Sequence, residues 1–141
     1  MSTASSLRYF IHKSGAVYIV GECFDHGSTA PHNFHLRVEG QEAIVNLDGY
    51  EPERYPLFGS LHEVAAVIDT IYPDIDGVFI DADSVYYLVF DAKSGRTNAP
   101  YHVIIEGDNV MECGAYSKGD GYPIEGEYTL HPSMMAIANL E

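Results

Sequence analysis

The sequence predicts an α+β fold: a curved antiparallel sheet of about eight strands, built from hairpins, with one main amphipathic helix (residues 60–72) packed on it. Three observations support this fold class. Segments rich in β-branched and aromatic residues recur in both halves of the chain, short polar turns separate them, and one segment has a strong helical period. The expected order is four strands, the helix, and then four or five further strands.

The first half of the chain predicts two hairpins. Residues 7–13 and 16–24 are strand-like and flank Ser14-Gly15, a two-residue turn signal. Apolar and polar residues then alternate cleanly over residues 34–39, which is typical of a strand with one buried and one solvated face. Gly40-Gln41 turns the chain into a fourth strand over residues 42–47.

The helix has the clearest local signal in the chain. Ser60 and Glu63 fit a capping box, and apolar residues follow at helical spacing. Pro73 ends the helix because the residue before a proline is excluded from the α region. Residues 48–59, which contain two prolines, are predicted to be irregular.

The second half is predicted to be mostly β. Residues 78–80 and 85–90 form a hairpin, and the second strand lies centrally in the sheet because both of its faces are apolar or aromatic. The remaining segments are a polar loop (93–100), a hairpin (101–106 and 110–116), a Gly-rich loop (117–126), a last strand (127–131) and a short helix or ordered tail (132–140).

The length of 141 residues predicts one domain over residues 1–141, and we find no convincing internal repeat at this level. Residues 1–6 are expected to be a flexible N-terminus, and residues 140–141 a candidate remnant of cloning. The chain shows neither a signal peptide nor an apolar run long enough for a membrane span, which predicts a cytoplasmic protein. Cys23 and Cys113 are then expected to be reduced and buried.

The charge of the chain is its main clue to function. The sequence holds 21 acidic and seven basic residues, for a formal net charge of −14. Because such an excess opposes folding through self-repulsion, we expect it to have a use. It argues against nucleic acid and anionic membranes as direct partners, since both attract basic surfaces. A basic protein is the simpler expectation.

The candidate partner-binding residues are acidic side chains of the second half and one tyrosine, because tyrosine is enriched at protein interfaces. Aspartate is also favoured at turns, and aspartates two apart can chelate a hard cation, so these alternatives remain open. The residues assigned to partner binding are Asp74, Asp76, Asp81, Asp83, Tyr86, Glu106, Asp108 and Glu112.

A second group of metal-ligand types lies in the first half, at Cys23, Asp25, His26, His32 and His35. Their spacing matches no standard zinc pattern, so we interpret the histidines as surface residues of a loop; whether they bind a metal stays open. No nucleophile elbow, phosphate-binding loop or metalloprotease helix is present. We therefore assign no catalytic residue, metal ligand or cofactor.

These observations favour a non-enzymatic acidic protein that occupies a basic surface of a partner protein. The favoured partner is a nuclease or another nucleic-acid-handling protein, which this chain would inhibit. In composition alone the chain resembles small acidic inhibitors of phage and bacterial conflict, such as immunity proteins and anti-CRISPR proteins. Two alternatives are a small metal-dependent or ligand-binding enzyme that uses the aspartate pairs 74/76 and 81/83, and a virion or assembly component. The sequence does not specify the oligomeric state.

Overall fold

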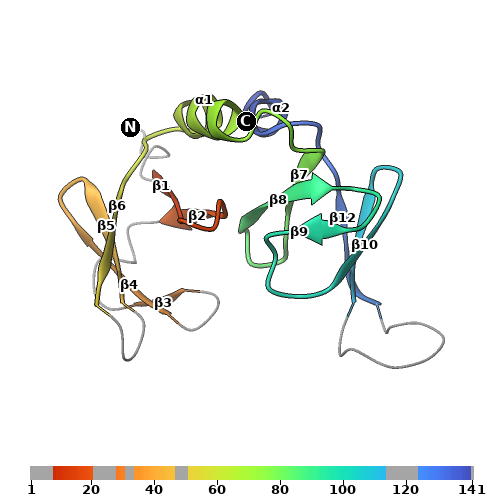
Figure 1. The fold of residues 1–141 in the computed structure, drawn as a ribbon. Coiled ribbons are helices and arrows are strands. Elements are labelled where there is room, and N and C mark those ends of the chain that lie inside the picture. The colour runs from red at the N-terminus through yellow and green to blue at the C-terminus, as the bar shows by residue number, and fades with distance from the viewer. Residues whose placement is uncertain (1–7, 21–27, 31–33, 47–50, 114–123, 141) are drawn as a thin grey trace.

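The computed structural model describes residues 8–20, 28–30, 34–46, 51–113 and 124–140 (Figure 1). Within these residues the fold is α+β, with antiparallel strands in three sheets and two helices, of which one is the main helix. The described strands do not close into a barrel. The expectation of one curved sheet of about eight strands is not confirmed, because the strands are divided among a central sheet and two flanking sheets.

The central sheet has the order β1-β2-β8-β7, and a short strand, β9, pairs with the end of β8. As predicted, β1–β2 and β7–β8 are hairpins, and β8 lies inside the sheet. The bounds are β1 Arg8–Ile11, β2 Val17–Val20, β7 Gly77–Ile80, β8 Tyr86–Asp91 and β9 Arg96–Thr97.

Each flanking sheet is built from consecutive antiparallel strands. The N-terminal sheet comprises β3 (Ser28–Ala30), β4 (Phe34–Glu39), β5 (Glu42–Asn46) and β6 (Glu53–Pro56). The C-terminal sheet comprises β10 (Val103–Glu106), β11 (Asn109–Cys113) and β12 (Ile124–Thr129).

Two predictions for these sheets were wrong. The segment expected to be irregular contains β6, which pairs with β5. Pro56 is tolerated there because β6 is an edge strand of its sheet. The last strand, β12, begins at Ile124 and so includes residues assigned to a loop.

The two helices are α1 (Leu61–Ile71) and α2 (Met134–Ala138). Both begin at a serine N-cap: Ser60 accepts a hydrogen bond from the backbone N–H of Glu63, and Ser133 accepts one from Ala136. The predicted main helix is confirmed, and the C-terminal segment contains a short helix. Ile71, the last residue of α1, is 55% exposed although it continues the helical spacing of apolar residues.

The side chains of α1 hold α2 at both of its ends. The Asp69 carboxylate accepts hydrogen bonds from the first backbone N–H groups of α2, those of Met134 and Met135, at 3.3 and 3.2 Å. At the other end, Nε2 of His62 lies 3.1 Å from Oδ1 of Asn139. The Asp69 contacts supply partners for backbone N–H groups that a helix N-terminus otherwise leaves unpaired.

Alternating residues of the central sheet contribute to two apolar cores. Tyr9, Val17, Tyr86 and Leu88 pack under the two helices on one face of the sheet. On the other face, Phe10, Tyr18, Phe79, Tyr87 and Val89 pack against buried residues of both flanking sheets. The helices and the flanking sheets therefore cover opposite faces of the central sheet.

The two hairpins of the central sheet are repeats of one another. Phe10, Ile11, Tyr18 and Val20 of the first hairpin have identical counterparts in Phe79, Ile80, Tyr87 and Val89 of the second. Val17 pairs with Tyr86, which is its own counterpart. An antiparallel pair between equivalent residues is symmetric, so it lies at an approximate two-fold axis that relates the two halves of the molecule (Figure 1).

The repeat continues beyond the central sheet. His35 to Gly40 (HLRVEG) corresponds to His102 to Gly107 (HVIIEG), and both glycines have a φ of 62°, which favours glycine. The flanking sheets attach to opposite edges of the central sheet through equivalent bridges, Tyr9↔Phe58 and Val78↔His131. A serine-capped helix follows each bridge.

The interpretation that the chain has no internal repeat was therefore wrong. Its core consists of two copies of one unit, each a hairpin, a flanking sheet and a helix. The copies differ most in their loops and in their surface charges, which is why the repeat is hard to recognise in the sequence.

Candidate functional site

The predicted aspartate pairs do not come together. Asp74 and Asp76 lie before β7, and Asp81 and Asp83 lie in the turn after it, so the four residues of β7 separate the pairs. At the rise of an extended strand the five steps from Asp76 to Asp81 place the pairs about 16 Å apart. Asp76 also accepts a hydrogen bond from the backbone N–H of Ala92 at 2.7 Å. The four carboxylates therefore do not form one acidic ridge or one metal site.

Asp81 is a structural residue of the β7–β8 turn. It is 8% exposed, and its Oδ1 accepts hydrogen bonds from the backbone N–H groups of Asp83 and Val85 at 2.9 and 3.0 Å. Its Oδ2 lies 3.3 Å from the hydroxyl of Tyr101. Burial raises the pKa of this carboxyl, while the two backbone donors oppose the rise. The assignment of Asp81 to partner contact is not supported.

Two other predicted contact residues face inward. Tyr86 is 4% exposed and packs in the core beneath the helices. Glu112 lies beside Tyr128, whose hydroxyl donates to the Glu112 carboxylate. A β-carbon on Gly126, opposite Glu112 on β12, would stand 2.5 Å from the Tyr128 hydroxyl and 3.0 Å from the Glu112 carboxylate, so a side chain there would displace this contact. The assignment of Tyr86 is corrected because the residue is buried, whereas Glu112 is half-buried and engaged by Tyr128 within the fold.

The other repeat has the same tyrosine–carboxylate contact, but there both residues lie on one strand, β6. The hydroxyl of Tyr55, the counterpart of Tyr128, donates to Glu53 at 2.7 Å. Glu53 pairs across the strands with Val45, whereas Glu112 pairs with Gly126. The inward carboxylate therefore lies on different strands in the two repeats, but in both it accepts a hydrogen bond from the equivalent tyrosine. This contact is part of the architecture that the repeats share.

Glu106 and Asp108 are exposed at the β10–β11 turn, where a partner can reach them. Two further exposed carboxylates, Glu125 and Glu127, lie on β12 of the same sheet. They were not among the predicted contact residues, because Glu125 was assigned to a loop. Their alternation with Gly126 and Tyr128 is the signal that could have found them.

The strand register places the outward residues of the C-terminal sheet in one row. Ile104 pairs with Met111, and Met111 pairs with Glu127. Ile104 is 37% exposed and Met111 is half-buried. Among the described residues of this sheet and its turns, five are acidic and none is Lys or Arg. We call the surface formed by Ile104, Glu106, Asp108, Met111, Glu125 and Glu127 the acidic face.

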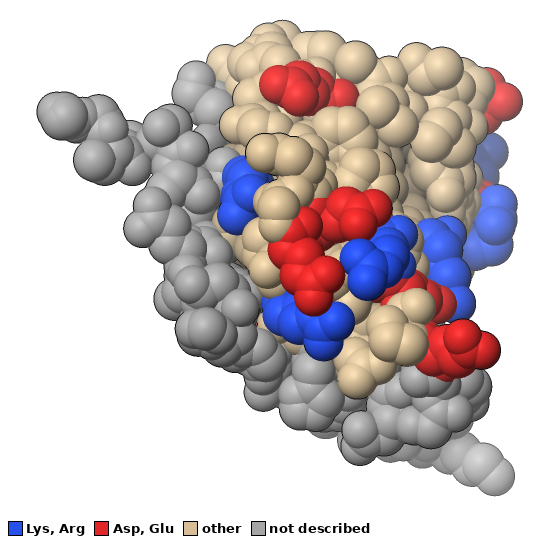
Figure 2. Space-filling model, turned by 90° about the vertical axis from the view of Figure 1, so that its left-hand side faces the viewer, with Lys and Arg blue, Asp and Glu red and all other residues tan. Residues whose placement is uncertain are grey.

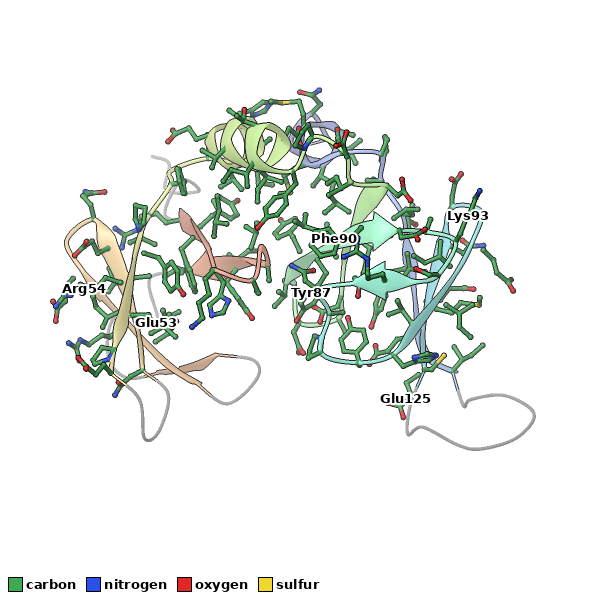
Figure 3. The ribbon with its side chains drawn as sticks, in the orientation of Figure 1. Glu53, Arg54, Tyr87, Phe90, Lys93 and Glu125 are labelled. Carbon is green, nitrogen blue, oxygen red and sulfur yellow. The ribbon has the colours of Figure 1, made fainter. Side chains whose placement is uncertain are left out.

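The equivalent row of the N-terminal sheet is Arg37, Ile44 and Arg54. Nε of Arg37 lies 3.0 Å from Glu39, and Arg54 lies 3.5 Å from Glu39 and 3.1 Å from Glu42. Figure 2 shows acidic and basic side chains next to one another on this side of the molecule. Arg54 points away from the central sheet, whereas its neighbour Glu53 points toward it (Figure 3). This face balances its own charges.

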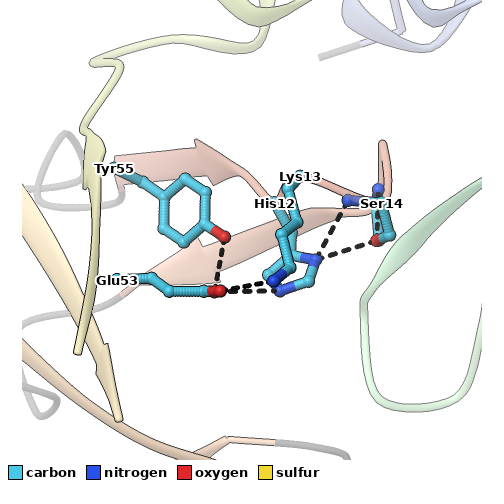
Figure 4. A network of polar contacts seen from close by, with 6 residues as sticks. His12, Lys13, Ser14, Glu53 and Tyr55 are labelled. Carbon is cyan, nitrogen blue, oxygen red and sulfur yellow. Dashed lines mark hydrogen bonds and ion pairs between the residues drawn. The ribbon is translucent and has the colours of Figure 1, made fainter. Parts of the chain in front are cut away.

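A polar network joins the β1–β2 turn to β6 (Figure 4). Nδ1 of His12 lies 2.9 Å from the Ser14 hydroxyl, and Nε2 lies 3.7 Å from Glu53, which also pairs with Lys13. The order Ser, His, Glu resembles a catalytic triad. However, Nδ1 also accepts the backbone N–H of Ser14 at 3.1 Å, as Oδ1 of Asp81 accepts that of Asp83 in the other repeat. We therefore interpret His12 as the cap of its turn.

The described tyrosines of the second half pack in or against the two apolar cores. Burial raises the pKa of the Tyr128 phenol to about 12, and it raises the pKa values of Tyr87 and Tyr101 further. These phenols are therefore protonated at neutral pH, and those of Tyr101 and Tyr128 donate to Asp81 and Glu112. Tyr87 and Tyr101 contact one another edge to face at 5.9 Å.

The histidine-loop candidates Cys23, Asp25, His26 and His32 lie outside the described residues, and His35 is described only through the backbone of β4. Among the described residues, no group of three or more His, Cys, Asp or Glu side chains is arranged to hold a metal ion. Cys113 is buried and unpaired in a disulfide. Nor does any described helix have the length and apolar character needed to cross a bilayer.

Comparison of the chain with protein families, with curated proteins and with solved structures finds no match.

Proposed function

We propose that the protein is a non-enzymatic binding protein whose acidic face docks on a basic surface of a partner protein. The favoured partner is a nuclease or another nucleic-acid-handling protein, which the chain inhibits by covering its basic groove. The observation that carries this proposal is that none of Glu106, Asp108, Glu125 and Glu127 has an ion-pair partner among the described residues.

Unpaired carboxylates on neighbouring strands repel one another and oppose folding. The N-terminal sheet removes this repulsion with two arginines, so the same architecture can balance its charge. On the acidic face the carboxylates remain unpaired, and a cationic partner that binds there relieves their repulsion. The opposite charges also speed the encounter and fix its orientation. The sign of the face argues against nucleic acid as the direct partner.

The test compares association of the protein with a panel of basic nucleases at 50 and 300 mM salt, by surface plasmon resonance and by inhibition of cleavage. We expect an association rate that falls at least about tenfold over this range, because salt screens exposed charges. The variant E106Q/D108N/E125Q/E127Q should lose most of the binding.

A matched control, E39Q/E42Q/E51Q/E63Q, removes the same number of charges from exposed positions outside the acidic face. It should keep most of the affinity. Equal losses in both variants would mean that only the net charge matters. If no basic nuclease binds at low salt, or if binding does not depend on salt, the proposed function is wrong.

A further inference from the structure

The two flanking sheets place an equivalent carboxylate in two different surroundings. Glu39 ends β4 and Glu106 ends β10, each directly before a glycine turn. Glu39 contacts two guanidinium groups, those of Arg37 and Arg54. The residues that replace them around Glu106 are Ile104 and Glu127, as the register of the two sheets shows. Glu106 therefore occupies the position equivalent to Glu39 but has neither guanidinium group beside it.

The same replacement changes how the apolar centre of the row is covered. Ile44 lies between the two arginines and is 1% exposed. Its counterpart Met111 is half-buried, and the neighbouring Ile104 is 37% exposed. Because long arginine stems cover apolar surface as well as carrying charge, losing them uncovers both the carboxylate and the apolar side chains.

We infer that the partner supplies a cation, preferably an arginine, that lies over Ile104 and Met111 between Glu106 and Glu127, in the place that arginines of the chain itself occupy in the N-terminal sheet. This inference rests on the proposed function and specifies its contact. Arginine suits the position better than lysine because its planar fork pairs with carboxylates and its stem packs on apolar groups.

Charge complementarity selects a basic protein as the occupant. A second copy of this chain is a poor fit, because Arg37 and Arg54 are already engaged by Glu39 and Glu42. Arg96, a basic residue of the described second half, lies over the ring of Phe90 at 5.1 Å. A foreign surface that presents an arginine to the acidic face satisfies both the apolar and the charged groups.

The test restores the missing arginines. The variant I104R/E127R should pair internally with Glu106, as the N-terminal sheet does with Glu39, and should close the site. We titrate the ¹⁵N-labelled protein with a hexa-arginine peptide and follow the amide shifts. In the parent protein the largest shifts should fall on β10–β12; in the variant they should weaken about tenfold or more.

The control I71R/E63R makes the same change in charge on α1, where Ile71 and Glu63 are exposed. It should bind the peptide at β10–β12 like the parent protein. The reciprocal variant R37I/R54E should create a second site on β4–β6 and shift amides there. If I104R/E127R fails to fold, as its amide spectrum would show, the reciprocal variant and the single variant E127R test the same inference.

Three outcomes are informative. Shifts on β10–β12 that only I104R/E127R abolishes support the inference. Amide shifts centred on Asp74–Asp76 or Asp83, or equal losses of binding in the control variant, overturn the inference. If the protein still binds basic nucleases in that case, the proposed function stands. A hexa-lysine peptide that binds as tightly as hexa-arginine overturns the preference for arginine.

Discussion

The N-terminal sheet and the C-terminal sheet are two versions of one design with opposite treatment of charge. Each attaches to an edge strand of the central sheet through one bridge, and each is held by a tyrosine stacked on a buried phenylalanine, Tyr55 on Phe10 at 5.3 Å and Tyr128 on Phe79 at 5.9 Å. The N-terminal sheet adds ion pairs on its surface, whereas the described C-terminal sheet has none.

The comparison separates residues that hold the fold from residues that are free to serve a partner. Phe10 and Phe79 are both fully buried, and the inward carboxylates of the two sheets both accept from a tyrosine. Such positions are shared because packing and buried hydrogen bonds tolerate little change. The outward rows differ at every position, and this difference is what the proposed function explains.

The largest expected effect comes from removing the aromatic anchors. Phe79→Ala and Phe10→Ala should each lower the free energy of unfolding by about 3–5 kcal/mol in urea titrations, because each empties a fully buried site. Hydrogen exchange should then differ between them. In Phe79→Ala the amides of β10–β12 should exchange faster. In Phe10→Ala the amides of β4–β6 should stay better protected, because the Lys13–Glu53 ion pair and the Arg8–Gly40 hydrogen bond still hold that sheet. Equal exchange in both sheets would break the comparison.

A smaller effect is expected at the equivalent hairpin turns of the central sheet. Gly15 has a φ of 94°, and its counterpart Ser84 has a φ of 64°. A positive φ raises the free energy of the folded state when the residue carries a β-carbon, as Ser84 does. Ser84→Gly should therefore raise the free energy of unfolding by up to about 1 kcal/mol. The reverse change, Gly15→Ser, should be destabilising, because a β-carbon there would stand 3.0 Å from Leu88. Thermal melts of both variants measure this, and a destabilised Ser84→Gly would contradict it.

The smallest effect is a difference in pH dependence between the two repeats. Hydrogen bonds from Lys13 and Tyr55 lower the pKa of Glu53 below 4.5, so this carboxylate stabilises the fold above pH 4.5 and stops doing so as the pH falls through its folded pKa. Glu53→Gln should cost up to about 1 kcal/mol at pH 7, since the pair is partly exposed, and little at pH 3.

The pKa of Asp81 is shifted in the opposite direction to that of Glu53. Burial raises its pKa above 3.8, so the folded state holds a proton that the unfolded state has released, and the carboxyl loses stabilising effect as the pH rises through that window. The stability of Asp81→Asn relative to the parent protein should rise from pH 3 to pH 7, while that of Glu53→Gln should fall. Urea titrations at both pH values measure this; parallel slopes would contradict the assignment of the two carboxyls.

Much of the local structure followed from the sequence, because its causes are local. The serine cap, the helical period and Pro73 defined α1, and strand alternation with turn residues defined both hairpins of the central sheet. The edge strand β6 was missed because its charges and Pro56 resemble a loop until the partner strand is known. Glu106 and Asp108 were found by their charge, while Glu125 and Glu127 needed the register of β12.

By itself the sequence determined the fold class, the position of the main helix and an excess of carboxylates that favours a basic partner. Only the tertiary structure decided which carboxylates form hydrogen bonds within the fold and which face outward. Asp81 and Glu112 accept hydrogen bonds from neighbouring groups, whereas Glu106 and Glu127 are exposed, and the local sequence pattern does not distinguish them. The tertiary structure also revealed the repeat, because equivalence between the halves lies in strand pairing and buried contacts. Pairing joins residues far apart in the chain, and no local period records it.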